Sequence, residues 1–147
     1  MSGILLQAEY ITVAMCVGDE PYLVTLNHGY DRDKKCIYFH CARDGNKTKI
    51  LKKNSRVWGQ AVVDKGYVQG ACDHLYASIH FKGKVTFVQD INEKRRALVI
   101  MIKALEEKPE EVIKKQVTKD SVLNVQIGRI DIEEMYGKKS ENVVISL

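Results

Sequence analysis

Apolar and polar residues alternate over much of the chain, which is the pattern of β-strands with one buried face. The clearest example is "HLYASIHFKGKVTFV", residues 74–88, where every second residue from Leu75 to Phe81 is apolar. The composition of "RVWGQAVVDKGYVQ" (56–69) and of "VLNVQIGRIDIEEMYG" (122–137) predicts two more strands. These segments predict a protein built mainly from β-sheet.

Three further strands are predicted before residue 45, at 10–17, 21–30 and 35–42. Short connections separate them, Gly18-Asp19 in the first case and Asp31-Arg32-Asp33 in the second. Short connections that contain Gly or Asp are typical of hairpin turns. The three segments are therefore expected to form an antiparallel meander.

The period changes to that of a helix in "QDINEKRRALVIMIKALEEK", residues 89–108. Asp90 and Glu93 have the spacing of a capping box, and an apolar stripe runs from Leu98 to Leu105. Shorter helices are predicted at 46–54 and from Pro109 onward. Many antiparallel strands with a few helices, in a chain of this length, indicate a small barrel with helices at its rim.

Composition narrows the choice of partners. The 147 residues carry a net charge of +4, with Lys and Arg spread along the chain, and this is too little for a nucleic-acid-binding surface. No segment approaches the roughly 18 apolar residues of a membrane span, and no signal sequence begins the chain. The four cysteines lack a C-x-x-C spacing, so no metal site is expected. We expect a cytoplasmic protein without a nucleic-acid or membrane partner.

The stretch "IYFHCARDGNKTKI", residues 37–50, carries the candidate chemistry. Alternation along its strand directs Phe39 toward the core and His40 outward, beside the turn at Gly45. Lys47 then lies at the start of a helix, where a cation opposes the helix dipole. This arrangement is favourable when an anion docks at the helix N-terminus, so the stretch predicts a phosphate site. The alternative is a lysine-rich surface helix that binds nothing.

The longer run "IYFHCARDGNKTKILKKNSRVWGQ" resembles the flavin-binding split-barrel proteins related to pyridoxamine 5′-phosphate oxidase, in particular the branch that includes the nitroimidazole-resistance-type proteins. In that branch a strand ending on histidine leads through a glycine and a lysine into a helix, here His40, Gly45 and Lys47. Tyr76 and Ser78 match a later strand of the family. The likeness covers nearly the whole chain in the same order.

The resemblance implies a mainly β fold: an antiparallel, Greek-key-like split barrel of six or so strands with two or three short helices, formed by residues 1–147 as a single FMN-binding domain. It also implies a homodimer with FMN between the subunits. Lys47 would pair with the FMN phosphate, and more so because the family often has arginine where this chain has Asn46. The predicted cofactor-binding residues are Leu26, Asn27, His28, His40, Cys41, Ala42, Asn46, Lys47 and Ser78.

The activity stays open at this point. The first hypothesis is an FMN-dependent oxidoreductase that passes electrons from a reduced nicotinamide or similar donor to a small acceptor of unknown identity, without a predicted catalytic side chain. The second is an FMN carrier or electron-transfer protein without turnover of its own. A third is a split barrel that binds deazaflavin F420 or haem, with His28, His40 or His80 as the haem ligand. The fourth is a barrel that binds no cofactor.

Overall fold

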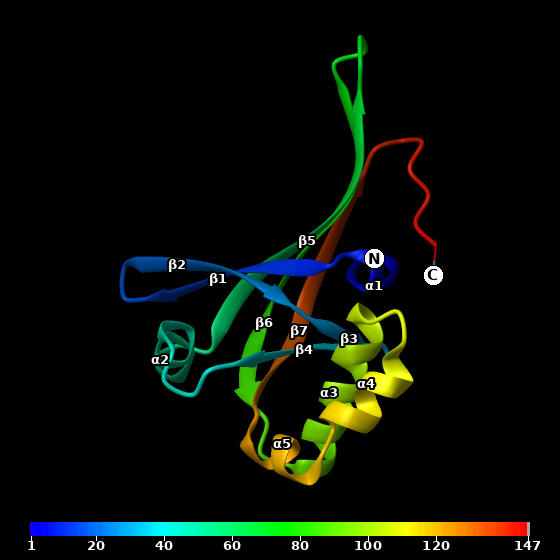
Figure 1. Cartoon of the computed structure of the whole chain (residues 1–147). Helices are drawn as coiled ribbons and strands as arrows, with labels where there is room; N and C mark the ends of the chain where they lie inside the picture. Colours follow the sequence, from blue (N-terminus) through cyan, green and yellow to red (C-terminus); the bar gives the residue numbers. More distant parts are fainter. Residues whose placement is uncertain (147) are drawn as a thin grey trace.

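The computed structural model describes residues 1–146 and contains a seven-stranded sheet whose neighbouring strands are all antiparallel. The strand order is β2-β1-β5-β6-β7-β4-β3 (Figure 1). The strands are β1 (Tyr10–Val17), β2 (Glu20–Asn27), β3 (Gly29–Asp31), β4 (Cys36–Cys41), β5 (Arg56–Val68), β6 (Asp73–Phe87) and β7 (Gln126–Lys139).

The two edges of this sheet, β2 and β3, are consecutive in the chain and are separated only by His28. At His28 the chain therefore passes from one edge to the other, which closes the sheet into a barrel that is split along this seam. The predicted fold class is confirmed. The predicted meander is wrong in one respect: residues 21–30 form two strands, of which β2 pairs with β1 and β3 pairs with β4.

Apolar side chains of every second strand residue fill the barrel, as the alternation predicts. A Cβ atom on Gly59 would overlap the ring of Phe81, so a glycine is required for the two neighbouring strands to pack here. The N-terminal helix α1 (Ser2–Gln7) covers part of the barrel with Ile4 and Leu5. Core residues that are at most 2% exposed include Ile11, Val13, Ile37, Phe39, Ile79, Phe81 and Ile130.

A second layer covers the outer face of β4. The helix α3 (Ile91–Leu105) packs on Cys36 and Tyr38, both buried, and forms a smaller apolar core with them. Alternation places Cys36 and Tyr38 on the same face of β4 as His40, which is predicted to point outward; the structure buries these two residues under α3, whereas His40 at the end of the strand is exposed. Helices α4 (Pro109–Gln116) and α5 (Lys119–Asn124) extend this layer, and the short helix α2 (Asn46–Lys53) follows β4.

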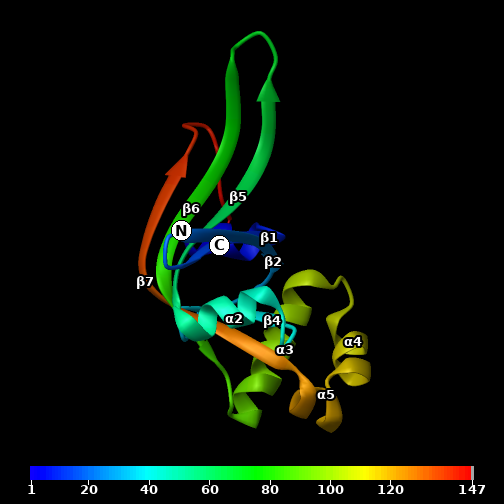
Figure 2. The same cartoon turned by 90° about the vertical axis from the view of Figure 1, so that its left-hand side faces the viewer.

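The helical layer and the β5–β6 hairpin lie toward opposite ends of the molecule. Figures 1 and 2 show α3, α4 and α5 together at one end, while β5 and β6 continue beyond the barrel as a long hairpin at the other. The count of strands is one above the prediction, and the helices α1 and α5 are additions of six residues each. In residues 1–146 the structure has no helix that is long and apolar enough to cross a membrane.

Candidate functional site

The connection between β4 and α2 leaves the N-terminus of α2 open. Gly45 is the N-cap residue, in an extended conformation (φ −69°, ψ 159°), and within residues 1–146 no side chain accepts a hydrogen bond from the first turn. The first turn also contains no acidic residue. Backbone N–H groups at this end therefore point away from the helix without a protein partner, which is the geometry of an anion site.

A buried polar cluster holds this connection in place. The hydroxyl of Thr48, which is fully buried, donates a hydrogen bond of 2.7 Å to the carbonyl oxygen of Ala42. The side-chain amide of Gln126 donates to Thr48 Oγ1 at 3.2 Å and to Cys41 Sγ at 3.3 Å. These bonds fix the shape of the turn on its buried side, whereas Asn46 lies on its exposed side.

Lys47 is the half-buried cation of this site. Its Nζ lies 5.8 Å from the centre of the Phe39 ring, on the barrel side of β4. In the described part of the chain, Lys47 and the other three lysines of α2 have no carboxylate within salt-bridge distance. The charge of Lys47 is thus available to a ligand.

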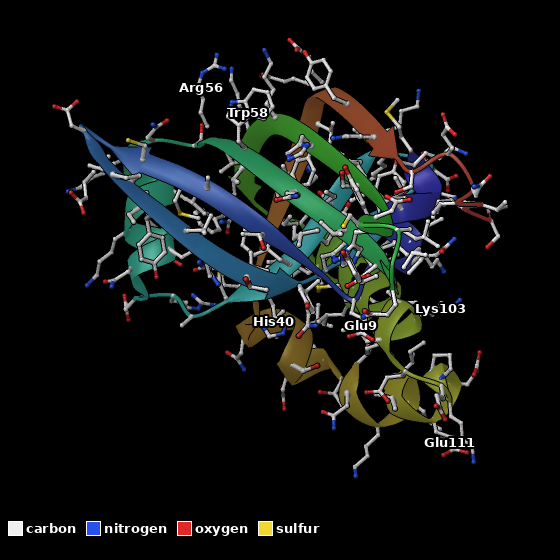
Figure 3. All side chains as sticks on the ribbon, turned by 90° about the horizontal axis from the view of Figure 1, so that it is seen from above. Glu9, His40, Arg56, Trp58, Lys103 and Glu111 are labelled. Atoms are coloured by element: carbon white, nitrogen blue, oxygen red, sulfur yellow. The ribbon has the colours of Figure 1, made fainter. Side chains whose placement is uncertain are left out.

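His40 faces the other side of β4 from Lys47. Its side chain lines a cavity between the end of β4 and the helical layer. Figure 3 shows His40 next to the helical layer. Phe39 and His40 alternate along the strand, and Lys47 lies over Phe39, so the structure does not place His40 and Lys47 on the same face. Cys41 and Ala42 join the two sides, because they lead from His40 into the turn.

The predicted residues at the end of β2 lie mostly below the surface. Leu26 is a core residue, and Asn27 is exposed and donates its side-chain N–H to the carbonyl oxygen of Glu9 at 3.2 Å. His28 is 2% exposed, with Nε2 2.8 Å from the carbonyl oxygen of Leu5 and Nδ1 without a partner in the described residues. Burial lowers the pKa of His28, which keeps the imidazole neutral.

Ser78 lies far from the β4–α2 turn within one chain. It is opposite Lys138 on β7, whereas Cys41 is opposite Gln126, twelve residues earlier on the same strand. Twelve residues of strand span about 40 Å. Ser78 is 4% exposed although its neighbour across the sheet, Val62, is exposed.

Sequence reasoning missed two residues of the site, Thr48 and Gln126. A threonine in a short helix is not distinctive, and Gln126 comes from a segment 78 residues away that carries no motif. Their contact depends on how β7 pairs with β4, which no local pattern specifies.

Comparison with known protein families finds a match over most of the chain. A family model described as pyridoxamine 5′-phosphate oxidase matches residues 3–139. No curated protein matches the chain.

Among solved structures, the chain is similar to that of a candidate 5-nitroimidazole antibiotic resistance protein from Bacteroides thetaiotaomicron, with 26% identity, a TM-score of 0.74, and coverage of 92% of this chain and 80% of that one. An FAD-binding protein from Mesorhizobium loti has 19% identity and a TM-score of 0.68, with 95% and 92% coverage. An FAD- and haem-binding protein from Mycobacterium smegmatis has 13% identity and a TM-score of 0.75, with 95% and 69% coverage. The last two likenesses concern the fold.

Proposed function

Since the chain belongs to the pyridoxamine 5′-phosphate oxidase family, we propose that it is an FMN-binding flavoprotein that holds the FMN phosphate at the start of α2. The observation that carries the proposal is the open N-terminus of α2 beside the unpaired Lys47. Backbone N–H donors and a point positive charge are the groups that bind a phosphate monoester.

The other residues of the site have supporting roles in this proposal. The backbone from Cys41 to Asn46 and the first turn of α2 form the cradle, the proposed phosphate site. Thr48 and Gln126 hold it rigid through their buried hydrogen bonds. A rigid cradle loses little conformational entropy when the phosphate binds. Bound FMN supplies two-electron redox chemistry, and the protein supplies position and electrostatics.

We further propose that the protein is a homodimer with FMN between its subunits. Two observations support this. The resemblance assigns Ser78 to the flavin site, and Ser78 and the N-terminus of α2 are too far apart to share a ligand within one chain, so a site that contains both requires a second copy. The outer face of the sheet also exposes Trp58 (50%) and Tyr136 (54%), whose rings stack with centroids 6.3 Å apart, on the opposite side of the molecule from His40 (Figure 3). Exposed aromatic clusters of this kind are typical of protein interfaces.

Sedimentation of wild type and of Trp58→Lys tests the proposed homodimer. We expect wild type to be a dimer and Trp58→Lys to be a monomer.

The cofactor experiment compares FMN with riboflavin, which lacks the phosphate. We expect wild type to bind FMN much more tightly than riboflavin, as measured by flavin fluorescence. Lys47→Ala should weaken FMN binding by at least about tenfold, because a charge-assisted contact is lost, while leaving riboflavin binding unchanged. The matched control is Lys52→Ala, at the other end of α2, which should bind FMN like wild type. A wild-type protein that binds neither flavin, and whose Tm does not change with FMN, would contradict the proposal.

We propose oxidoreductase activity rather than a carrier role because the end of β4 has the proposed FMN phosphate site on one face and a cavity lined by His40 on the other. Multiple turnovers of reduced nicotinamide oxidation by the FMN-loaded protein, in the presence of a small acceptor, would separate the two. A single stoichiometric oxidation would support the carrier.

A further inference from the structure

A cavity of about 320 Å³ lies between the end of β4 and the three helices α3, α4 and α5. This volume is at the lower limit of the usual range for small-molecule sites. Its wall is made largely of aliphatic and methionine side chains from the helical layer. The lining includes His40, Leu105, Glu106, Val112, Gln116 and Ser121.

The helices do not fill this space, although they carry apolar side chains beside it. All eight residues of α4 are at least partly exposed, including the cavity-lining Val112. On α3, Leu105 is 48% exposed, although it belongs to the apolar stripe that should face the core. Protein interiors normally pack without voids of this size, so the exposed apolar wall costs stability unless a ligand covers it.

Two polar side chains of the lining have free hydrogen-bonding capacity. Both side chains are exposed, and within residues 1–146 neither the ring of His40 nor the side-chain amide of Gln116 forms a hydrogen bond with another protein group. Ser121 is already committed to the cap of α5, where it donates to the carbonyl oxygen of Gln116 at 2.6 Å. The described lining contains no Lys or Arg, and Glu106 would repel an anion. The charges therefore disfavour an anion, and the largely apolar wall suits an uncharged ligand.

We propose that this cavity binds a small, uncharged, largely apolar organic molecule with a hydrogen-bonding oxygen directed to His40. His40 lies on the opposite face of β4 from Lys47, so this ligand and the proposed FMN phosphate occupy separate sites that are joined by the turn at Cys41–Asn46. The binding itself rests on the cavity.

Menadione, an uncharged bicyclic quinone, is a suitable probe. Titration followed by amide NMR shifts should perturb the ends of β4 and of α3, α4 and α5, in the presence and in the absence of FMN. Val112→Phe, which fills the cavity from α4, should weaken menadione binding at least about tenfold, as expected when a bulky side chain occupies a pocket. His40→Phe should weaken it by about two- to tenfold, because one neutral hydrogen bond is lost.

The matched control is Val144→Phe, the same substitution at a residue that is 83% exposed in the C-terminal segment. It should bind menadione like wild type. Flavin binding should be unchanged in both phenylalanine variants, which also shows that Val112→Phe is folded. If wild type binds no flavin, the menadione titration still tests the cavity, so the failure of one proposal is distinguishable from the failure of the other.

Three results would overturn the inference. One is equal menadione affinity in Val112→Phe and Val144→Phe. The second is a set of shifts confined to the outer sheet face around Trp58. The third is a His40-dependent Soret band on addition of hemin that displaces menadione, which would assign the cavity to haem.

Discussion

The N-termini of α2 and α3 differ in how their first backbone N–H groups are capped. Both helices follow a strand closely, and both begin with backbone N–H groups that lack partners within the helix. At α3 the carboxylate of Asp90 accepts a hydrogen bond of 2.7 Å from the N–H of Glu93. At α2 the corresponding residue is Gly45, and within residues 1–146 no side chain caps the helix. The first turn of α3 is capped by the protein, whereas the first turn of α2 has no side-chain cap in the described residues.

The charges around the two helices differ in the same way. Near α3, Arg129 donates to Glu93 at 2.8 Å, and Arg96 donates to Asp31 at 2.8 Å. The four lysines of α2 have no such partner in the described residues. Paired charges indicate a structural role for the α3 region, whereas unpaired charges beside open N–H groups indicate binding. Variants in the two regions should therefore affect different properties.

The largest effect on stability is expected at Glu93. Its carboxylate accepts hydrogen bonds from the hydroxyl of buried Tyr38 at 2.9 Å and from Arg129 at 2.8 Å. Glu93→Ala should lower the free energy of unfolding by about 3 kcal/mol, because both donors lose their acceptor. Glu93→Gln, which keeps an acceptor oxygen, should lose less. Urea unfolding measures both, and a loss below about 1 kcal/mol for the alanine variant would show that the α3 network is not structural.

Acid should weaken the contact between α3 and Asp31. The hydrogen bond from Arg96 holds the pKa of Asp31 below its usual value, against the opposing effect of burial. A carboxyl whose pKa is lowered by folding contributes stability above its unfolded pKa, and this contribution is lost as the pH falls through the folded pKa. Asp31→Asn should lower the free energy of unfolding at pH 7 by about 1–3 kcal/mol. Between pH 7 and pH values below 4, the stability of this variant should fall less than that of wild type. Thermal unfolding from pH 7 to 3 tests this, with Lys47→Ala expected to follow the wild-type curve.

The sequence predicted more of the α2 region than of the α3 region. The strand, the glycine, the lysine and the helix of the cradle are contiguous, so local pattern was enough to predict them together. The burial of Cys36 and Tyr38 depends on the docking of α3, which lies more than fifty residues later. An apolar composition on both faces of "CIYFHC" was the available signal.

Tertiary context also decided the features that local pattern did not predict. Residues 21–30 have continuous strand composition, and only the closure of the barrel divides them at His28. The helix α5 is six residues long, too short for an apolar repeat, and its signal was the capping box at Thr118 and Ser121. The cavity at His40 needs three helices and a strand end, so no single segment predicts it.

A smaller loss of stability is expected at the cap of α3. Asp90→Ala removes the acceptor for the N–H of Glu93 and should cost about 1 kcal/mol, the usual value for an N-cap residue. FMN affinity should not change, since the cap lies outside the proposed site. Unfolding and flavin titration of the same sample check both statements, and a parallel loss of FMN affinity would mean that the two helices are not independent.

The substitution with the smallest expected effect on stability is at Gly45, and it should have a large effect on FMN binding. Gly45 has N-cap geometry that any residue can adopt, and a Cβ atom there would lie 3.8 Å from the Cβ of Ala42, an ordinary contact. Gly45→Asp should therefore give α2 the cap that α3 already has, and should raise the stability of the FMN-free protein by about 0.5 kcal/mol. The new carboxylate would occupy the N–H groups and oppose the phosphate beside Lys47, so FMN binding should weaken at least about tenfold. Gly45→Ser supplies a neutral cap and should stabilise the protein with a smaller loss of affinity. If Gly45→Asp raises the Tm and still binds FMN like wild type, the phosphate is held elsewhere, and the open end of α2 is only an uncapped helix.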